Sequence, residues 1–217
     1  MKKFIFLFSI FTLFCGCALF DEESYEMNKN AQALVQEGSS AFVEKEYKAA
    51  IKAYTDLKDW YPFSKYAILA ELKIADSHFH LAEYAEAISA YEEFENMHPK
   101  NEAIPYVIYQ TGLSWFNQID TVDRDHTPAK NSLKQFNRLL KMFPDSEYSK
   151  KARKNIQKCT DNISGHELYV ANWYLKTEKY QAALNRYAYI IENYPDSKAA
   201  KEAQAKILEH RKLIDNN

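Results

Sequence analysis

Small, aromatic and apolar residues recur at fixed distances along most of the chain. Each copy has five positions, at successive distances of three, four, three and five residues. They hold in turn an aromatic or small residue, a small residue, an aromatic residue, an apolar residue and a proline. Residues three or four apart share one face of a helix, and proline ends a helix, so each copy predicts an amphipathic helix that stops before its proline. The copies are Tyr47, Ala50, Tyr54, Leu57 and Pro62; Tyr84, Ala87, Tyr91, Phe94 and Pro99; Ala129, Ser132, Phe136, Leu139 and Pro144; and Tyr180, Ala183, Tyr187, Ile190 and Pro195.

A partner helix is predicted before each of the first three copies, over residues 32–44, 67–81 and 104–119. Gly38 and Gly112 lie in these segments where the paired helix is expected to cross. Helix pairs of this pattern match the tetratricopeptide repeat. In that repeat a small residue lets two helices approach closely, and an aromatic ring fills the space between them.

A longer helix is predicted over residues 146–177, and a last helix over residues 197–213 closes the array with a polar outer face. The predicted fold class is all-α, a tetratricopeptide-like helix-pair solenoid that forms a right-handed superhelix of about four to five repeats over residues 29–217. The composition agrees, because 4 Gly, 6 Pro and 47% hydrophobic residues suit long helices better than a β-sandwich. A net charge of -2 argues against nucleic acid as a partner.

The N-terminus has the pattern of a targeting signal. Lys2 and Lys3 precede an apolar stretch over residues 4–14, which is too short to span a bilayer but has the length of a signal-peptide core. The stretch leads to Gly16 and Cys17, and a small residue before a cysteine at this place resembles the bacterial lipobox. In lipobox proteins that cysteine becomes the lipidated first residue, so lipidation is predicted at Cys17.

This resemblance divides the N-terminal region into a lipoprotein signal peptide over residues 1–16 and a lipidated tether over residues 17–28. Several acyl chains would hold a soluble domain stably on a membrane. Ala18 follows the cysteine, and in enteric-type bacteria a residue other than Asp at that position implies retention at the outer membrane. The alternative is an ordinary cleaved signal peptide with an incidental cysteine.

Catalytic motifs find no support in the sequence, which contains no Gly-rich phosphate loop, no Gly-x-Ser-x-Gly and no His-Glu-x-x-His. His78 and His80 are two positions apart, so on a helix they point in different directions and do not form a metal pair. Cys159 sits at helical spacing from apolar residues and is predicted to be a small buried side chain. The expectation is therefore a protein that is not an enzyme, with no cofactor and no metal site.

An acidic segment holds Asp120, Asp123 and Asp125. It lacks the glycine and the closing glutamate of an EF-hand calcium loop. We interpret it as a hydrogen-bonded turn that caps the next helix, with Thr127 as the cap and Pro128 as the first helical residue.

The first helix of each pair lines the concave groove of a tetratricopeptide superhelix, and here its groove positions are apolar and aromatic. An extended peptide with aromatic anchors would suit such a groove. The alternative is that several of these side chains are ordinary core. The predicted peptide-binding residues are Phe42, Leu72, Phe79, Tyr106 and Tyr109, within a wider lining that includes Val35, Ser39, Leu69, Asp76, Leu113 and Phe116.

Four segments resemble one family, the outer-membrane β-barrel assembly lipoproteins known as BamD. They are residues 61–67, 105–113, the acidic segment with its flanks over 118–129, and 136–148. The resemblance covers nearly all of the chain after Cys17. It implies a scaffold at the periplasmic face of the outer membrane that binds the barrel-forming assembly subunit, accessory lipoproteins and unfolded outer-membrane proteins.

The same resemblance implies that the C-terminal half docks the barrel subunit. Asn162 falls where a basic contact residue is expected in this family. The alternative function is a periplasmic tetratricopeptide coordinator of a cell-wall or envelope transport machine. The acidic segment with its Arg-Asp pair favours the assembly family, because the families of the alternative lack it.

Overall fold

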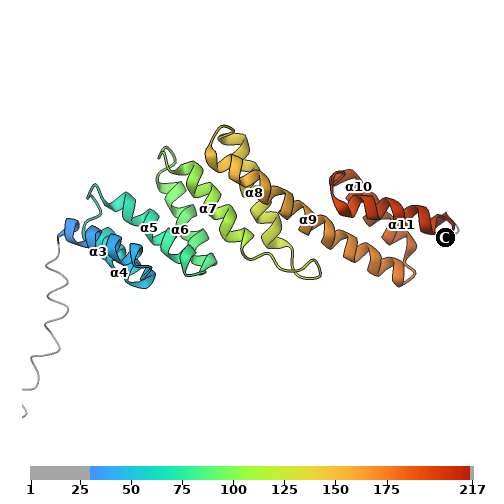
Figure 1. The fold of residues 1–217 in the computed structure, drawn as a ribbon, viewed down its shortest axis with the longest axis horizontal. Coiled ribbons are helices and arrows are strands. Elements are labelled where there is room, and N and C mark those ends of the chain that lie inside the picture. Colours follow the sequence, from blue (N-terminus) through green and yellow to red (C-terminus); the bar gives the residue numbers. More distant parts are fainter. Residues whose placement is uncertain (1–29, 216–217) are drawn as a thin grey trace, which may run out of the picture. The chain divides into compact units, whose positions relative to one another are not determined.

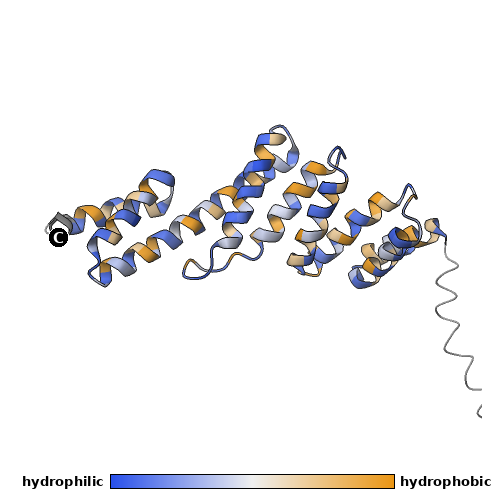
Figure 2. Ribbon diagram, turned by 180° about the vertical axis from the view of Figure 1, so that it is seen from behind, coloured by the Kyte–Doolittle hydropathy of each residue, from blue (hydrophilic) through white to orange (hydrophobic). Residues whose placement is uncertain are grey.

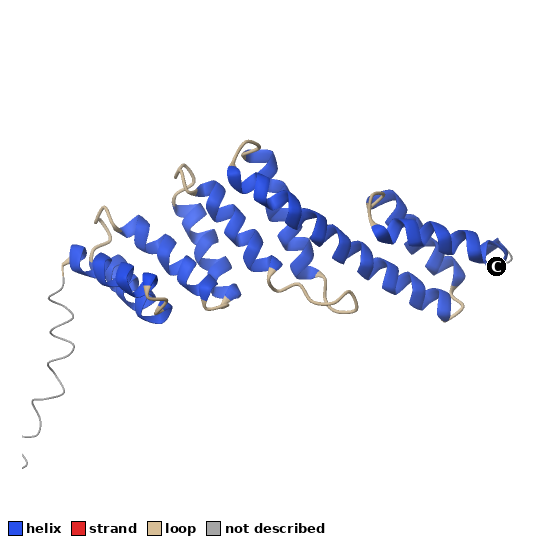
Figure 3. Cartoon of the chain, in the orientation of Figure 1, coloured by secondary structure: helices blue, strands red, loops and turns tan. Residues whose placement is uncertain are grey.

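The computed structural model describes residues 30–215, and in this part of the chain it contains helices joined by loops and no strand (Figure 3). Cys17, the predicted signal peptide and the predicted tether lie outside the described residues. The helices are α3 (Ala31–Val43), α4 (Tyr47–Trp60), α5 (Ala67–His80), α6 (Tyr84–Met97), α7 (Ile104–Phe116), α8 (Thr127–Met142), α9 (Glu147–Lys176), α10 (Tyr180–Asn193) and α11 (Lys198–Asp215).

The predicted all-α, tetratricopeptide-like helix-pair fold is confirmed, and the predicted helices begin and end within a few residues of the observed ones. Hydrophobic and hydrophilic residues alternate along each helix (Figure 2), as amphipathic packing requires. The chain divides into two compact units, one ending at Ile74 and one beginning at Ala75, so that α5 contributes to both. In the first unit α3 and α4 pack together, and in the second the helices from α6 to α11 pack in order (Figure 1).

The connection between the two helices of a pair is a tight turn of one repeated form. Lys45, Ala82 and Glu178 each adopt a left-handed conformation, with φ of 64°, 59° and 61°. The following amide donates back five residues in each case, for example from Glu46 N to Ala41 O at 2.8 Å. This is the hydrogen bond of a Schellman cap, which usually employs glycine. The α7–α8 connection is instead a longer loop.

The recurring aromatic residues form the centre of each pair. Tyr54, Tyr91, Phe136 and Tyr187 are at most 1% exposed. A Cβ atom added to Gly112 would lie 2.6 Å from Phe136 Cε1, and one added to Gly38 would lie 2.8 Å from Tyr54 Cε1. The prediction that both glycines mark a close helix crossing is therefore confirmed.

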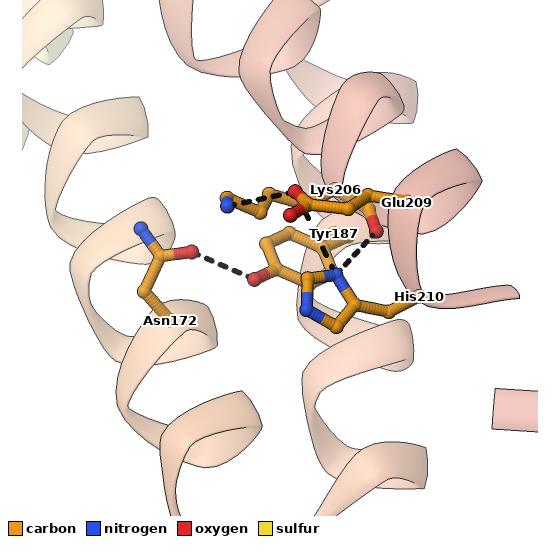
Figure 4. Close-up of polar contacts among 5 residues, drawn as sticks. All are labelled: Asn172, Tyr187, Lys206, Glu209 and His210. Atoms are coloured by element: carbon orange, nitrogen blue, oxygen red, sulfur yellow. Dashed lines mark hydrogen bonds and ion pairs between the residues drawn. The ribbon is translucent and has the colours of Figure 1, made fainter. Parts of the chain in front are cut away.

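Each buried tyrosine hydroxyl has a partner fifteen residues earlier, on the first helix of the same pair. Tyr91 donates to Asp76, and Tyr187 donates to Asn172 at 2.7 Å (Figure 4). The Tyr54 hydroxyl lies 3.1 Å from Ser39 Oγ. The fourth ring belongs to Phe136, which has no hydroxyl to satisfy.

The long helix α9 packs against two groups of helices within the second unit. Its N-terminal part packs on α7 and α8, where Cys159 and Ile163 are buried. Its C-terminal part packs on α10 and α11 through Ala171, which shares a core with residues of both. α9 therefore joins two parts of the stack without a break.

The two glycines of α7 and α9 provide a matched test of the packing. We expect Gly112→Ala to lower the free energy of unfolding by about 1–3 kcal/mol, because its methyl group meets a buried ring that cannot move. Gly165→Ala meets Val122, which is 39% exposed and can shift. Alanine has a higher helix propensity than glycine by about 1 kcal/mol, so the free energy of unfolding of Gly165→Ala should be unchanged or higher. Chemical denaturation measures both, and equal effects would contradict this packing.

Candidate functional site

The five predicted peptide-binding residues belong to different units. Phe42 and Leu72 are half-buried in the first unit. The Phe42 ring packs edge-on against Tyr47 with centroids 5.5 Å apart, and Lys73 Nζ lies 4.4 Å from its centroid. Phe42 thus presents an apolar ring with a positive charge beside it.

Phe79, Tyr106 and Tyr109 are half-buried in the second unit. The Phe79 ring packs edge-on against Tyr84 at 5.8 Å. Tyr109 lies 5.8 Å from Phe136 and 5.7 Å from Tyr148 between ring centroids. None of the three is fully buried, so each shows part of its surface to solvent.

Asp76 is not a groove residue, which corrects its place in the predicted lining. It is 3% exposed, and its Oδ1 accepts hydrogen bonds from the hydroxyls of Tyr91 and Tyr106, each at 2.7 Å. Burial and the Asp76 carboxylate raise the pKa of both tyrosines, so both hydroxyls stay protonated as donors. Gln110 Nε2 donates to the Tyr106 oxygen at 2.9 Å. The Tyr106 hydroxyl therefore has its hydrogen-bond partners within the protein, and only the Tyr106 ring is available to contact a peptide.

Sequence analysis missed the contribution of α9 to this site. Tyr148 lies 5.5 Å from Tyr106 and 5.7 Å from Tyr109 between centroids, and Lys151 Nζ lies 5.0 Å from the Tyr148 centroid. Tyr148 and Lys151 are three apart and share a face of α9, but spacing within α9 does not indicate that this face meets α7. We call Tyr106, Tyr109 and Tyr148 the α7–α9 aromatic cluster.

A second cation borders the same helices. Lys158 Nζ lies 5.7 Å from the Phe116 centroid. Lys151 also pairs with Glu147 at 3.6 Å. Aromatic rings bordered by lysine side chains suit a peptide that carries aromatic residues and negative charge.

The acidic segment is a structural turn, as predicted. Asp125 Oδ1 accepts from Thr127 N at 2.9 Å and from Thr127 Oγ1 at 2.8 Å, and these bonds lower the pKa of Asp125. Asp123 accepts from Thr121 Oγ1. The predicted cap needs one correction. α8 begins at Thr127, so Thr127 is the first helical residue and not the cap. Asp125 accepts hydrogen bonds from both the amide and the hydroxyl of Thr127.

The same loop is held against α9. Asn162 Nδ2 donates to Asp120 O at 2.9 Å, and His166 Nδ1 lies 2.7 Å from Val122 O. The rings of His126 and His166 stack with centroids 4.1 Å apart. Asn162, the position expected to be basic, therefore anchors a loop.

The C-terminal helices carry the polar contacts of Figure 4. Lys206 and Glu209 form an ion pair at 2.9 Å on α11, and His210 Nδ1 lies 3.8 Å from Glu209. α9 exposes Tyr169 and Trp173 by 50% and 48%, and α10 exposes Tyr189 by 42%. Tyr169 and Trp173 are four apart, so they share one face of α9, and half-exposed aromatic rings of this kind suit a protein partner.

The remaining chemical candidates have structural roles. His78 Nδ1 lies 2.7 Å from Glu83 Oε2. Cys159 is fully buried, its Sγ donates to Ser132 Oγ at 3.4 Å, and burial raises the pKa of its thiol. No group of three or more His, Cys, Asp or Glu residues in the described part of the chain is arranged to hold a metal ion. Among the described helices, none is long and apolar enough to cross a bilayer.

Comparison with known proteins gives a consistent family. A family model described as outer membrane lipoprotein matches residues 27–216. The chain is 28% identical to the outer membrane protein assembly factor BamD of Neisseria meningitidis serogroup A, over 94% of this chain and 82% of that protein. It is 27% identical to the BamD of Rickettsia prowazekii, over 99% of this chain and 85% of that protein.

Solved structures with a similar arrangement are tetratricopeptide proteins. A thermophilic tetratricopeptide protein of Thermus thermophilus aligns with 82% of this chain and all of that chain at 14% identity and a TM-score of 0.45. The tandem tetratricopeptide domain of yeast Sti1 in complex with an Hsp90 peptide aligns with 85% of this chain and 74% of that chain at 14% identity and a TM-score of 0.46.

The double acceptor at Asp76 yields a stability prediction. We expect Asp76→Ala to lower the free energy of unfolding by about 2–4 kcal/mol, because two hydroxyls lose their shared acceptor in a buried place. Ser39→Ala removes the equivalent partner from Tyr54 at a less buried position, so its expected cost is about 1 kcal/mol or less. Denaturant titration of the two variants measures the difference. If Ser39→Ala lowers the free energy of unfolding as much as Asp76→Ala does, the two hydrogen bonds to Asp76 do not stabilise the fold more than the single one at Ser39.

Proposed function

The chain belongs to this family of outer membrane lipoproteins, and on that premise we propose that it is a scaffold subunit of the machinery that assembles β-barrel proteins in the outer membrane. The observation that carries the proposal is the match to named assembly factors over nearly the whole chain, together with a stack of helix pairs that offers protein-binding surfaces. The same relatives favour this function over the alternative of a cell-wall or envelope-transport coordinator. The scaffold works by binding, and we assign it no catalytic residue, metal or cofactor.

The proposed location is the periplasmic face of the outer membrane, through a lipid on Cys17. The support is the apolar segment over residues 4–14 that leads to Gly16-Cys17, together with the family. Acyl chains contribute about 0.8 kcal/mol for each buried CH₂ group, so two or more chains anchor a domain stably.

We assign the barrel-forming subunit to the exposed aromatic surface of α9 and α10. Tyr169 and Trp173 are four apart and therefore share one face of α9. Lys179 Nζ lies 5.2 Å from the Trp173 centroid, which adds a positive charge at its end. Aromatic anchors of this kind dominate the binding energy of protein interfaces. Accessory lipoproteins are the other proposed partners.

We assign unfolded outer-membrane proteins to the half-buried aromatic surfaces. Phe79, Tyr106 and Tyr109, joined by Tyr148, form the surface in the second unit, while Phe42 and Leu72 form one in the first. Aromatic rings provide a large contact area with few rotatable bonds. An unfolded segment loses conformational entropy when it binds, so its affinity should be modest.

The anchor prediction concerns one atom, the sulfur of Cys17. We expect Cys17→Ser to abolish labelling by a fatty-acid analogue and to release the protein from the membrane fraction. Metabolic labelling followed by membrane fractionation measures both. Equal labelling of the variant and the parent would reject the anchor.

The docking prediction uses two half-exposed side chains. We expect Trp173→Ser to reduce co-purification of the barrel subunit from outer membranes in mild detergent at least about tenfold, the effect of removing a central aromatic anchor. Met142→Ser is the matched control, because Met142 is 51% exposed but lies on α8. If both variants retain the barrel subunit, the interface lies elsewhere on the stack.

The substrate prediction concerns Phe79 on α5 and Tyr109 of the α7–α9 aromatic cluster. We expect Phe79→Ala with Tyr109→Ala to weaken binding of a labelled C-terminal barrel peptide about threefold to tenfold at unchanged helicity, because two apolar contacts are lost. Tyr189→Ala, which alters an exposed ring on α10, should leave the affinity unchanged. Fluorescence anisotropy measures the affinities. A peptide whose terminal aromatic is replaced by Ser must bind more weakly to the parent protein, and equal binding of both peptides would refute this role.

A further inference from the structure

The loop between α4 and α5, residues 61–66, projects one apolar ring into solvent. The Phe63 side chain is 101% exposed, compared with 79% for Val43 and 70% for Leu208. Trp60, at the end of α4, is 38% exposed. An isolated exposed apolar residue is ordinary. Here a wholly exposed phenylalanine follows a partly exposed tryptophan by three residues. The Phe63 ring contributes nothing to the core of the first unit.

The loop holds Phe63 in this position through a set of hydrogen bonds. Ser64 N donates to Tyr61 O at 2.9 Å, and Ala67 N donates to Ser64 O at 3.0 Å. Ser64 Oγ accepts from Tyr66 N at 3.2 Å. Tyr61 and Tyr66 pack against the core of the first unit. Both sides of the loop are therefore fixed, and Phe63 lies between them at the tip.

The register of α3 and α4 places this tip at the end where the chain enters the folded part. The short turn after Val43 makes the two helices antiparallel, and Gly38 and Ser39 lie opposite Tyr54. Moving six residues back along α3 and the same distance forward along α4 brings Gln32 and Ala33, two to three residues after Asn30, opposite Trp60, after which the loop begins. Packed helices lie about 8–10 Å apart, so Asn30 and the tip lie at the same end of the pair.

The length of chain before Asn30 keeps this end near the membrane. Twelve residues lie between Cys17 and Asn30, a span of at most about 45 Å when fully extended. A short connection of this kind gives the loop a high effective concentration at the bilayer surface. This step rests on the proposed anchor at Cys17.

We propose that Phe63, together with Trp60, inserts into the interfacial region of the lipid bilayer and forms a second membrane contact beside the lipid anchor. Tryptophan and tyrosine favour the membrane–water interface, and phenylalanine enters the apolar side of it. Lys65, whose Nζ lies 4.9 Å from the Tyr66 centroid, places its charge at the level of the headgroups. The contact fixes which end of the α3–α4 pair faces the membrane.

A bilayer fits this loop better than a folded partner does. The loop presents a single projecting ring, and the disordered interface of a bilayer can close around it, whereas a protein would need a matching pocket. Lys58, Asp59 and Lys65 leave a single net positive charge near the tip, so the contact depends on ring insertion more than on anionic lipid.

The test uses the full mature chain with Cys17→Ser, so that the loop is measured without the lipid anchor. The probe is a vesicle of phosphatidylethanolamine and phosphatidylglycerol, and flotation measures the partition coefficient. We expect Phe63→Ser to lower that coefficient about fivefold to tenfold, as removal of one inserted ring requires. Val43→Ser is the matched control, because Val43 is 79% exposed at the other end of α3, about 20 Å away, and should have no effect.

A second measurement reports the position of the ring itself. Phe63→Cys and Val43→Cys are labelled separately with the fluorophore NBD in the Cys17→Ser chain, where Cys159 is buried. We expect vesicles to shift the emission to the blue at position 63 only. Failure of the parent to partition at high lipid, or equal partition of Phe63→Ser and the parent, would overturn the proposal, whatever fatty-acid labelling shows for Cys17. A blue shift produced by the periplasmic domains of the barrel subunit and not by vesicles would also overturn it, and would assign the loop to a protein partner.

Discussion

The packing of one aromatic ring against a small residue on the preceding helix is the constraint on which each helix pair depends. Phe136 and Tyr54 lie so close to Gly112 and Gly38 that a Cβ atom would overlap the ring. This contact brings two helices together at a short distance and permits one register, because moving either helix by one turn would place a larger side chain against the ring. The cap turns at Lys45, Ala82 and Glu178 then direct the second helix back along the first.

The choice of tyrosine at this central position creates a second requirement. A buried hydroxyl costs free energy unless it is hydrogen-bonded, so the first helix must carry a partner at the right height. Ser39, Asp76 and Asn172 meet that requirement. Asp76 also accepts from Tyr106, whose ring belongs to the proposed peptide surface. The core and the proposed peptide surface thus share this residue, and we expect a substitution at Tyr106 to affect both.

The length of α9 links the loop after α7 to the surface assigned to the barrel subunit. Asn162 and His166 hold the loop, and the next turns on the same face of α9 expose Tyr169 and Trp173. A rigid helix that carries both features keeps them at a constant spacing, because its backbone hydrogen bonds are all internal. The acidic segment is thus held against α9 on the face that carries the proposed docking residues. Its carboxylates are occupied by the turn itself, with Asp125 bound to Thr127 and Asp123 to Thr121.

The sequence by itself determined the helix pairs, their boundaries and the central rings, because small, aromatic and apolar residues at helical spacing leave one face to bury. It also pointed to the close approach at Gly38 and Gly112 and to the family. Only the tertiary structure showed that Asp76 turns into the core, that Asp125 caps α8 in place of Thr127, and that Tyr148 joins Tyr106 and Tyr109. It alone showed that Phe63 has no neighbour that covers it. The contacts of Asp76 and Tyr148 join residues 15 to 42 positions apart, while those of Asp125 and Phe63 depend on which side chains of a turn reach a helix end or face solvent, and periodicity along one helix contains no information on either.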